Sequence, residues 1–375
     1  MKRRVRGRGD RFNWGGSVPK SILLVRLSAR GDVVFATPLV RALKERFPDA
    51  RVSWLVEPHT MDLVAHHPAL DAVIVWPRRE WRDLLIRGRW LELSRRILAF
   101  RRQLRGAKFD VALDLQGLLK SAVIAWASGA KTRIGVGSRE MSHLFMSCVF
   151  SDHDLSRVSS QYLELAEFLG LPTAQFHMEV ALSDDERAFA ARAMEEHALE
   201  DGFAALIPFT TWPQKHWFEE RWAELAERLR NELALVPVLF GGPEDHAAAA
   251  RITEASDTVI VDMVGRTSLT EASALIERSS LLVGVDTGLN HIGIAFDRPT
   301  VSLFGANVPY FSTPTDRGAI LRRPLPCSPC HRRPTCGGAF PCMKLITVDD
   351  VIQAAAGRLA LQQIPDQGRV SLRGT

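Results

Sequence analysis

One acidic residue stands out in the first predicted strand-to-helix turn. The stretch RLSARGDVVFATPLVRAL, residues 26–43, joins an apolar run at 22–25 to a segment with helical periodicity. Phosphate-binding turns at this place in a βαβ unit carry several glycines, but this turn has Gly31 alone, followed by Asp32. Because a carboxylate repels a phosphate, the turn predicts a different task for Asp32.

Three turns in the second half of the chain have residues suited to a nucleoside diphosphate. They lie in IPFTTWPQKHW, LFGGPEDHA and VGVDTGLNHIGIAF, and their candidate residues are Thr210, Thr211, Lys215, Glu244, Asp245, Asp286, Thr287, Gly288, Leu289 and His291. Each turn follows a predicted strand, and ligands of open α/β sheets bind at the carboxyl ends of strands. We expect Lys215 and the backbone amides at 287–288 to bind the diphosphate, and one of the two acids at 244–245 to bind the ribose.

Simpler interpretations exist for three of these residues. Asp286 could only cap the helix that follows it, which is a common task for Asp before Thr-Gly. His291 could be a buried histidine with satisfied hydrogen bonds, and Lys215 could be a solvated surface lysine.

Four of the five cysteines are close together in CSPCHRRPTCGGAFPC, at Cys327, Cys330, Cys336 and Cys342. Their spacing is compatible with a tetrahedral thiolate site for zinc or an iron–sulfur cluster. Disulfides are the alternative in an oxidising compartment. Four thiolates leave no open coordination position, so a metal bound here is expected to be structural and not catalytic.

Composition and length predict a two-domain globular protein. The 375 residues are 46% hydrophobic and 24% charged, and no apolar stretch reaches the ~20 residues that span a bilayer. The basic N-terminus lacks the apolar region and cleavage site of a signal peptide, which predicts a cytoplasmic location. Residues 1–180 carry a net charge of +11 and the remainder −6, so the first half is expected to meet an anionic partner.

Strand-like and helix-like segments alternate along the chain and predict an α/β fold with two doubly wound parallel sheets. In the first half we expect strands at 22–27, 52–56, 72–75 and 111–113, with helices at 33–46, 81–104 and 117–127. In the second half we expect strands at 204–208, 235–240, 259–261, 281–285 and 300–304. The alternation begins again after a predicted hinge near 172–182, with a helix whose capping box is formed by Ser183 and Glu186.

These segments give predicted boundaries for the domains. A basic disordered tail covers 1–20, a first domain 21–175, and a second domain 183–345 that includes the cysteine loop 327–342. A helix at 348–361 lies in a C-terminal region of 346–375 and is expected to pack on either domain.

The chain resembles glycosyltransferase family 9, the ADP-heptose:lipopolysaccharide heptosyltransferases, over about residues 22–360. The resemblance depends on SARGD, DLQGLLKSA, TTWPQKHW and VDTGLNHIGIAFDRP in this order, and the last is the most specific. It implies the GT-B architecture, in which two Rossmann-like domains face each other across a cleft. It also implies inversion at the sugar without a catalytic metal, with ADP-heptose in the C-terminal domain and a lipid acceptor in the N-terminal one.

The resemblance also implies roles for single residues. Asp32 corresponds to the general base, and Lys215 would stabilise the leaving diphosphate. Residues expected to bind the acidic acceptor are Arg79, Arg82, Lys120 and Arg139. The stretch 78–105 has ten arginines against three acids, with Trp81 and Trp90 among them, which also suits an anionic inner-membrane surface.

The identity of the acceptor remains open at this point. TTWPQKHW and VDTGLNH favour the heptosyltransferase I type, which transfers to the 3-deoxy-manno-octulosonic acid (Kdo) of lipid A. Transfer to a heptose, or from another nucleotide sugar, is the alternative within the family. A zinc-containing nucleic-acid-binding protein is a remote alternative, because it would leave the turns of the second domain unused.

Overall fold

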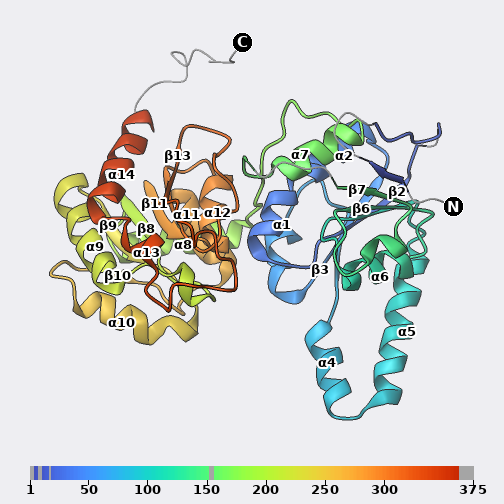
Figure 1. The fold of residues 1–375 in the computed structure, drawn as a ribbon, viewed down its shortest axis with the longest axis horizontal. Helices are drawn as coiled ribbons and strands as arrows, with labels where there is room; N and C mark the ends of the chain where they lie inside the picture. Colours follow the sequence, from blue (N-terminus) through green and yellow to red (C-terminus); the bar gives the residue numbers. More distant parts are fainter. Residues whose placement is uncertain (1–3, 7–10, 17, 152–155, 363–375) are drawn as a thin grey trace. The chain divides into compact units, whose positions relative to one another are not determined.

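The computed structural model describes all residues except 1–3, 7–10, 17, 152–155 and 363–375. The chain divides into two compact units, each built around one parallel sheet with helices (Figure 1). Unit 1 contains residues 1–155 and 159–181, and unit 2 contains residues 156–158 and 182–375.

The sheet of unit 1 has the strand order β1-β7-β6-β5-β2-β3-β4, and every neighbouring pair is parallel. The central strands consist of continuous apolar residues because helices cover both of their faces. Its strands are β1 (Arg4–Arg6), β2 (Ser21–Val25), β3 (Arg51–Val56), β4 (Ala72–Val75), β5 (Val111–Asp114), β6 (Thr132–Val136) and β7 (Cys148–Phe150).

The helices of unit 1 include two pairs where the sequence predicted single helices. They are α1 (Arg30–Ala36), α2 (Pro38–Arg46), η1 (Pro58–Thr60), α3 (Asp62–Ala65), α4 (Arg78–Ile86), α5 (Trp90–Gly106), α6 (Leu119–Ala127), η2 (Ser142–Phe145) and α7 (Ser160–Phe168). The predicted helix 33–46 ends at Thr37 because Pro38 has no N–H to donate to the carbonyl of Val34. The Thr37 hydroxyl donates to that carbonyl instead, at 2.7 Å.

The predicted helix 81–104 is an antiparallel helical hairpin of α4 and α5, which projects away from the sheet of unit 1 (Figure 1). Gly88 makes the reversal possible, because its φ of +67° lies in the left-handed region.

The prediction of a disordered tail over 1–20 is wrong for part of the described residues. β1 pairs with β7, the Phe12 amide donates to Phe168 O at 2.7 Å, and Trp14 Nε1 donates to Leu169 O at 2.9 Å. The Phe12 ring also contacts Trp14 and Phe168 edge-on. Aromatic side chains therefore attach this segment to unit 1. The prediction of disorder was based on the basic charge of the segment and did not take these aromatic residues into account.

The sheet of unit 2 is also entirely parallel, in the order β10-β9-β8-β11-β12-β13. Four of the five predicted strands are present close to their predicted bounds, the one predicted at 259–261 is the two-residue β10, and β13 is an additional edge strand. The strands are β8 (Phe203–Ile207), β9 (Val236–Leu239), β10 (Val261–Asp262), β11 (Leu281–Val285), β12 (Thr300–Phe304) and β13 (Gly318–Arg322).

The helices of unit 2 begin with the predicted capping box, in which the Ser183 side chain accepts from Glu186 N at 3.3 Å. They are α8 (Asp184–Glu196), η3 (Pro213–Lys215), α9 (Glu219–Leu233), η4 (Pro243–Asp245), α10 (His246–Glu254), α11 (Leu269–Arg278), α12 (Gly288–Ala295), α13 (Pro341–Lys344) and α14 (Val348–Gln362). α14 packs on unit 2, where Val351 and Ala355 are fully buried in the core. Among the described helices, none combines the length and the apolarity needed to cross a membrane.

Candidate active site

Asp32 lies in the first turn of α1, directly beyond the carboxyl end of β2. Its carboxylate accepts a hydrogen bond from the Ala29 amide at 3.2 Å and forms an ion pair with the Arg26 guanidinium. The Asp32 side chain is 39% exposed, so one side of the carboxylate remains open to a ligand. The turn thus presents a fixed carboxylate at the position where related folds bind phosphate.

Arg26 is a functional candidate that the sequence analysis did not identify. Its side chain is buried, and Nη1 donates to the carbonyl of Leu115 at 2.7 Å. Burial is the largest influence and acts to lower the pKa of Arg26, but Asp32, Tyr162 and Asp114 together outweigh it and the pKa is raised. The guanidinium therefore stays charged and holds Asp32 in one orientation. Its only signal in the sequence was its position as a charged residue directly after the apolar run of β2.

The DLQG stretch supports the same turn from the end of β5. Gln116 Oε1 accepts from the Leu27 amide at 3.1 Å, and Asp114 Oδ1 accepts from the amides of Gln116 and Gly117 at 3.1 and 3.2 Å. Gly117 has a φ of +66°, and a Cβ there would lie 2.4 Å from the carbonyl of Val136. Burial is the main cause that raises the pKa of Asp114 to about 6.

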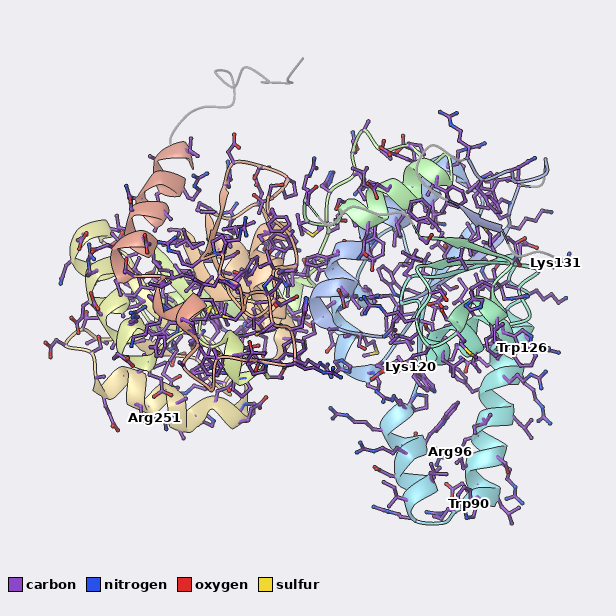
Figure 2. All side chains as sticks on the ribbon, viewed as in Figure 1. Trp90, Arg96, Lys120, Trp126, Lys131 and Arg251 are labelled. Atoms are coloured by element: carbon purple, nitrogen blue, oxygen red, sulfur yellow. The ribbon has the colours of Figure 1, made fainter. Side chains whose placement is uncertain are left out.

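Glu57, a buried acid directly after β3, forms ion pairs with two basic side chains of unit 1. Glu57 binds Lys120 Nζ at 3.2 Å and Arg78 at 3.5 Å, and Figure 2 labels Lys120 at the start of α6. The neighbouring His59 has a lowered pKa, first because of burial and then because of cations that include Arg79 and Lys120. The structure therefore brings two predicted acceptor residues, Arg79 and Lys120, close to His59.

The other two predicted acceptor residues are less closely connected to this cluster. Arg82 is exposed on α4. Arg139 is exposed, and its amide donates to Gly117 O at 2.8 Å, so the backbone fixes its position beside the DLQG turn.

In unit 2 the buried carboxylate of Asp286 contacts two other predicted donor residues, Lys215 and His291. Asp286 Oδ2 lies 2.6 Å from Lys215 Nζ, and Oδ1 lies 3.4 Å from His291 Nε2. Asn307, which the sequence analysis missed, donates to Asp286 Oδ2 at 2.9 Å. Burial would raise the pKa of Asp286, but His291 and Lys215 together hold it well below its usual range. Lys215 is thus an ion-paired lysine and not a solvated one.

The start of α12 shows that Asp286 is not a helix cap. Thr287 is the residue before the first helical turn, and the Asp286 carboxylate contacts the side chains named above. Thr287, Gly288 and Leu289 are half-buried residues at the start of α12, where the first amides of a helix have no acceptor within the helix and the helix dipole favours an anion. Thr210 donates to Asp286 O at 3.4 Å, whereas Thr211 is exposed on the preceding loop.

The two predicted ribose acids line a cavity of about 220 Å³. Glu244 and Asp245 share this cavity with His216, whose ring nitrogen lies 2.7 Å from Thr210 O. Asp245 accepts from the Gly242 amide at 2.8 Å, and burial is the main cause that raises its pKa. The loop 208–217 therefore connects the cavity to the Lys215–Asp286 pair, and His216 is a further residue that the sequence analysis did not single out.

The cysteine loop does not form a metal-binding group in the described residues, and its four thiols form no disulfide. Burial raises the pKa of both Cys330 and Cys342, and the nearby thiols add to the effect. The thiols thus lie near one another in unit 2, but not at ligand geometry.

Comparison with known proteins decides the family. The sequence profile of glycosyltransferase family 9 (heptosyltransferase) matches residues 97–338. The chain belongs to glycosyltransferase family 9. It is similar to lipopolysaccharide heptosyltransferase 1 of Salmonella typhimurium, at 29% identity over 310 residues that cover 80% of this chain and 90% of the relative.

Solved structures agree with this assignment at the level of the fold. A family 9 glycosyltransferase from Veillonella parvula matches with a TM-score of 0.77 and 23% identity, covering 91% of this chain and 98% of its own. An Escherichia coli heptosyltransferase solved with ADP-2-deoxy-2-fluoro heptose matches with a TM-score of 0.66 and 24% identity, covering 90% and 99%. The family 9 chain therefore has the predicted GT-B fold with two Rossmann-like units, and it is a glycosyltransferase.

Proposed function

We propose that this family 9 enzyme transfers heptose from ADP-heptose to the Kdo region of lipopolysaccharide, with inversion at the anomeric carbon. The observation that carries the proposal is the partly exposed Asp32 carboxylate, fixed at the start of α1 by Arg26 and Ala29. Support for the two substrates comes from the Salmonella relative, described as a lipopolysaccharide heptosyltransferase, and from the E. coli neighbour solved with an ADP-heptose analogue.

In the proposed reaction Asp32 is the general base. It accepts the proton of an acceptor hydroxyl while that oxygen bonds to the anomeric carbon and the bond to the ADP oxygen breaks. A carboxylate is a weak base for an alcohol, so proton transfer accompanies bond formation at a centre that has become cation-like. ADP leaves with the electron pair, and Lys215 and the amides at 287–288 stabilise its developing charge.

The two units take different substrates in this proposal. Residues 21–175 form the acceptor domain, in which Arg79, Arg82, Lys120 and Arg139 bind the anionic groups of the lipid-linked sugar. Residues 183–345 form the donor domain. There Thr210, Thr211, Lys215, Asp286 and His291 lie around the diphosphate, and Glu244 and Asp245 lie at the ribose.

No metal takes part in the proposed transfer. A structural zinc in the loop 327–342 stays a prediction. The enzyme is placed in the cytoplasm, at the inner face of the inner membrane, because its acceptor is anchored there. The alternative of a zinc-containing nucleic-acid-binding protein is set aside, since family membership accounts for both units.

Mass spectrometry tests this function directly. The purified chain is incubated with ADP-heptose and Kdo-containing lipid A, and the acceptor is expected to gain the mass of one heptose. Parallel reactions with a heptose-bearing acceptor, and with other nucleotide sugars, decide between the alternatives within the family. Transfer only in one of those parallel reactions would reject the Kdo acceptor or the heptose donor.

A further inference from the structure

The end of the α4–α5 hairpin exposes an unusual concentration of apolar side chains. Within residues 85–91, hereafter the hairpin tip, Ile86 is 74% exposed, Trp90 62% and Leu91 77%. The side chain of Leu85 is 44% exposed. Figure 2 shows Trp90 at the end of the hairpin that lies farthest from the sheet of unit 1. Exposed apolar side chains gathered in this way mark an interaction site.

The hairpin does not need these side chains for its own packing. Its internal contacts lie nearer the sheet, where Trp81 contacts Phe100 edge-on at 5.4 Å and Trp76 at 6.1 Å between ring centres. Leu84 on α4 is buried, and Leu104 on α5 is buried in the core of unit 1. The base of the hairpin is therefore a packed apolar layer, and the apolar tip is additional to it.

The turn at the tip is well defined. The Gly88 amide donates to Leu85 O at 3.1 Å and the Arg89 amide donates to Leu84 O at 2.9 Å, which is the hydrogen-bond pattern of a glycine-terminated helix. This turn places Ile86 on one side of Gly88 and Trp90 and Leu91 on the other. The three side chains thus belong to one ordered end of the hairpin.

Arginines surround the apolar tip and extend along both helices. Of the ten arginines at 78–105, Arg78, Arg89 and Arg96 form ion pairs with carboxylates. In the described part of the chain the other seven have no such partner: Arg79, Arg82, Arg87, Arg95, Arg101, Arg102 and Arg105. Arg87 lies within the tip, and Arg95 lies four residues beyond it on α5. The hairpin therefore has a large uncompensated positive charge next to an apolar end.

We propose that the hairpin tip inserts into an anionic lipid bilayer, with Ile86, Trp90 and Leu91 among the acyl chains and the adjacent arginines at the headgroups. Tryptophan suits the boundary between apolar and wet regions, and aliphatic side chains with flanking cations are typical of surfaces that lie in a membrane interface. Each basic residue near an anionic surface adds to the attraction. A nucleic acid fits this tip less well, because Ile86 and Leu91 beside Trp90 are aliphatic and offer its bases no ring to stack on.

Vesicle binding tests the proposal. Full-length protein is sedimented with phosphatidylcholine vesicles, with or without one-third phosphatidylglycerol. We expect binding only to the anionic vesicles. Replacing the tip residues together (Ile86→Ser, Trp90→Ser, Leu91→Ser) should weaken it by at least about tenfold, and the pair Arg87→Ala, Arg95→Ala should also weaken it, more strongly at low salt.

A matched variant controls for the loss of exposed apolar surface. Val259 and Leu345 are 82% and 50% exposed in unit 2, and Val259→Ser with Leu345→Ser should bind vesicles like the unaltered chain. Equal vesicle binding by the tip variant and the unaltered chain would overturn the proposal, as would no binding by the unaltered chain. A tip variant that loses self-association but keeps vesicle binding would show that a second copy covers the tip, and would also overturn it.

The inference rests on the proposed function for its effect on turnover, and the two can fail separately. The tip variant should transfer heptose at the normal rate to an acceptor stripped of its acyl chains, but more slowly to acceptor embedded in anionic vesicles. Vesicle binding without any heptose transfer would reject the proposed function alone. Transfer without vesicle binding would reject the membrane site alone.

Discussion

At the scale of single residues, Asp32 is defined by the groups around it. The Arg26 guanidinium and the Ala29 amide hold the carboxylate, and 39% of the side chain remains exposed. Asp32→Asn keeps the size and the contact with Ala29 but cannot accept a proton. We expect turnover to fall by about 10²–10⁴-fold while ADP affinity is unchanged, as measured by initial rates and calorimetry.

The control for this variant is Asp62→Asn, which alters an exposed acid in the first turn of another helix of unit 1. It should leave turnover unchanged. Near-normal turnover in Asp32→Asn would remove Asp32 from the role of base.

The raised pKa of Asp114 leads to a prediction of how the stability of the fold changes with pH. Because burial raises its pKa to about 6, the folded chain keeps this proton between about pH 4 and pH 6, where an unfolded aspartate has released it. The free energy of unfolding should therefore decrease as the pH rises through this window. Asp114→Asn lacks the effect, so its stability relative to the unaltered chain should rise by about 2–3 kcal/mol from pH 4 to pH 7.

Urea unfolding at both pH values measures this difference. Asp83→Asn, an exposed acid on α4, serves as the control and should show no such change. A constant difference between Asp114→Asn and the unaltered chain across pH would show that Asp114 is ionised throughout.

Lys215 is predicted to bind the diphosphate of the donor, so its replacement should weaken the binding of ADP. Its ammonium lies 2.6 Å from Asp286 and 4.2 Å from the centre of the Trp212 ring. Lys215→Met keeps the aliphatic stem but removes a charged donor to phosphate, so ADP should bind about 10–100-fold more weakly by calorimetry. Lys344→Met, at an exposed position of the same unit, should bind ADP normally. Unchanged ADP affinity in Lys215→Met would place the diphosphate elsewhere.

The sequence revealed those site residues whose task depends on their neighbours in the chain. Asp32 follows the turn glycine, and Asp286 and His291 lie five residues apart in one strand-to-helix segment, so the sequence alone marked them as candidates. Glu57 was not identified because its partner Lys120 lies 63 residues away in the chain, and for Arg26 the sequence did not show that its side chain turns back to Asp32 and to Leu115 O. Only the folded sheet brings these pairs together.

At the scale of elements, apolar runs predicted most strands but not β1, β6, β7 and β13. β1 and β7 have only three residues each, β6 (TRIGV) mixes polar residues and glycine with apolar ones, and β13 is a half-exposed edge strand, so none of them shows a long apolar run. The helix breaks at Thr37 and Gly88 were also missed, although a proline follows the first and the second is itself a glycine. In both places the amphipathic pattern continues across the break and concealed it.

The cysteine loop is an element whose function metal analysis can decide. Its thiols approach one another without reaching ligand geometry in the described residues. If the predicted structural zinc is present, freshly purified protein should contain about one equivalent, and the Cys330→Ser variant should contain much less. Metal-free protein with five titratable thiols would show a free-thiol loop.

At the scale of the whole molecule, the alternation of strands and helices was enough to predict two doubly wound units. Each unit has one parallel sheet, and each places its candidate residues beyond the carboxyl ends of strands, as in β2 and β11. The charge asymmetry between the halves has a physical counterpart in the arginine-rich hairpin of unit 1. Composition thus predicts that unit 1 meets an anionic partner, and the structure shows that ten of its arginines lie on this hairpin.

The division of labour between the units predicts how acceptor and donor kinetics separate. Arg79→Ala with Arg82→Ala removes two potential charge-assisted hydrogen bonds from unit 1, each worth about 1.5–3 kcal/mol before solvent screening. Both side chains are exposed, so we expect a rise of about tenfold in acceptor KM. Donor KM should stay within about a factor of two, because unit 2 is unaltered. Added salt should shrink the effect, since exposed charges are screened over about 10 Å at 0.1 M.

The matched control lies on the same hairpin. Arg102→Ala with Arg105→Ala removes equal charge from α5, at positions not assigned to the acceptor, and should leave KM for a water-soluble, deacylated acceptor unchanged. Using that acceptor for both variants separates sugar recognition from any attraction to a membrane. A rise in donor KM for the Arg79 and Arg82 variant would assign the two substrates the opposite way round. An equal rise in acceptor KM for both variants would show that the total charge of the hairpin matters, and not contacts made by these two arginines.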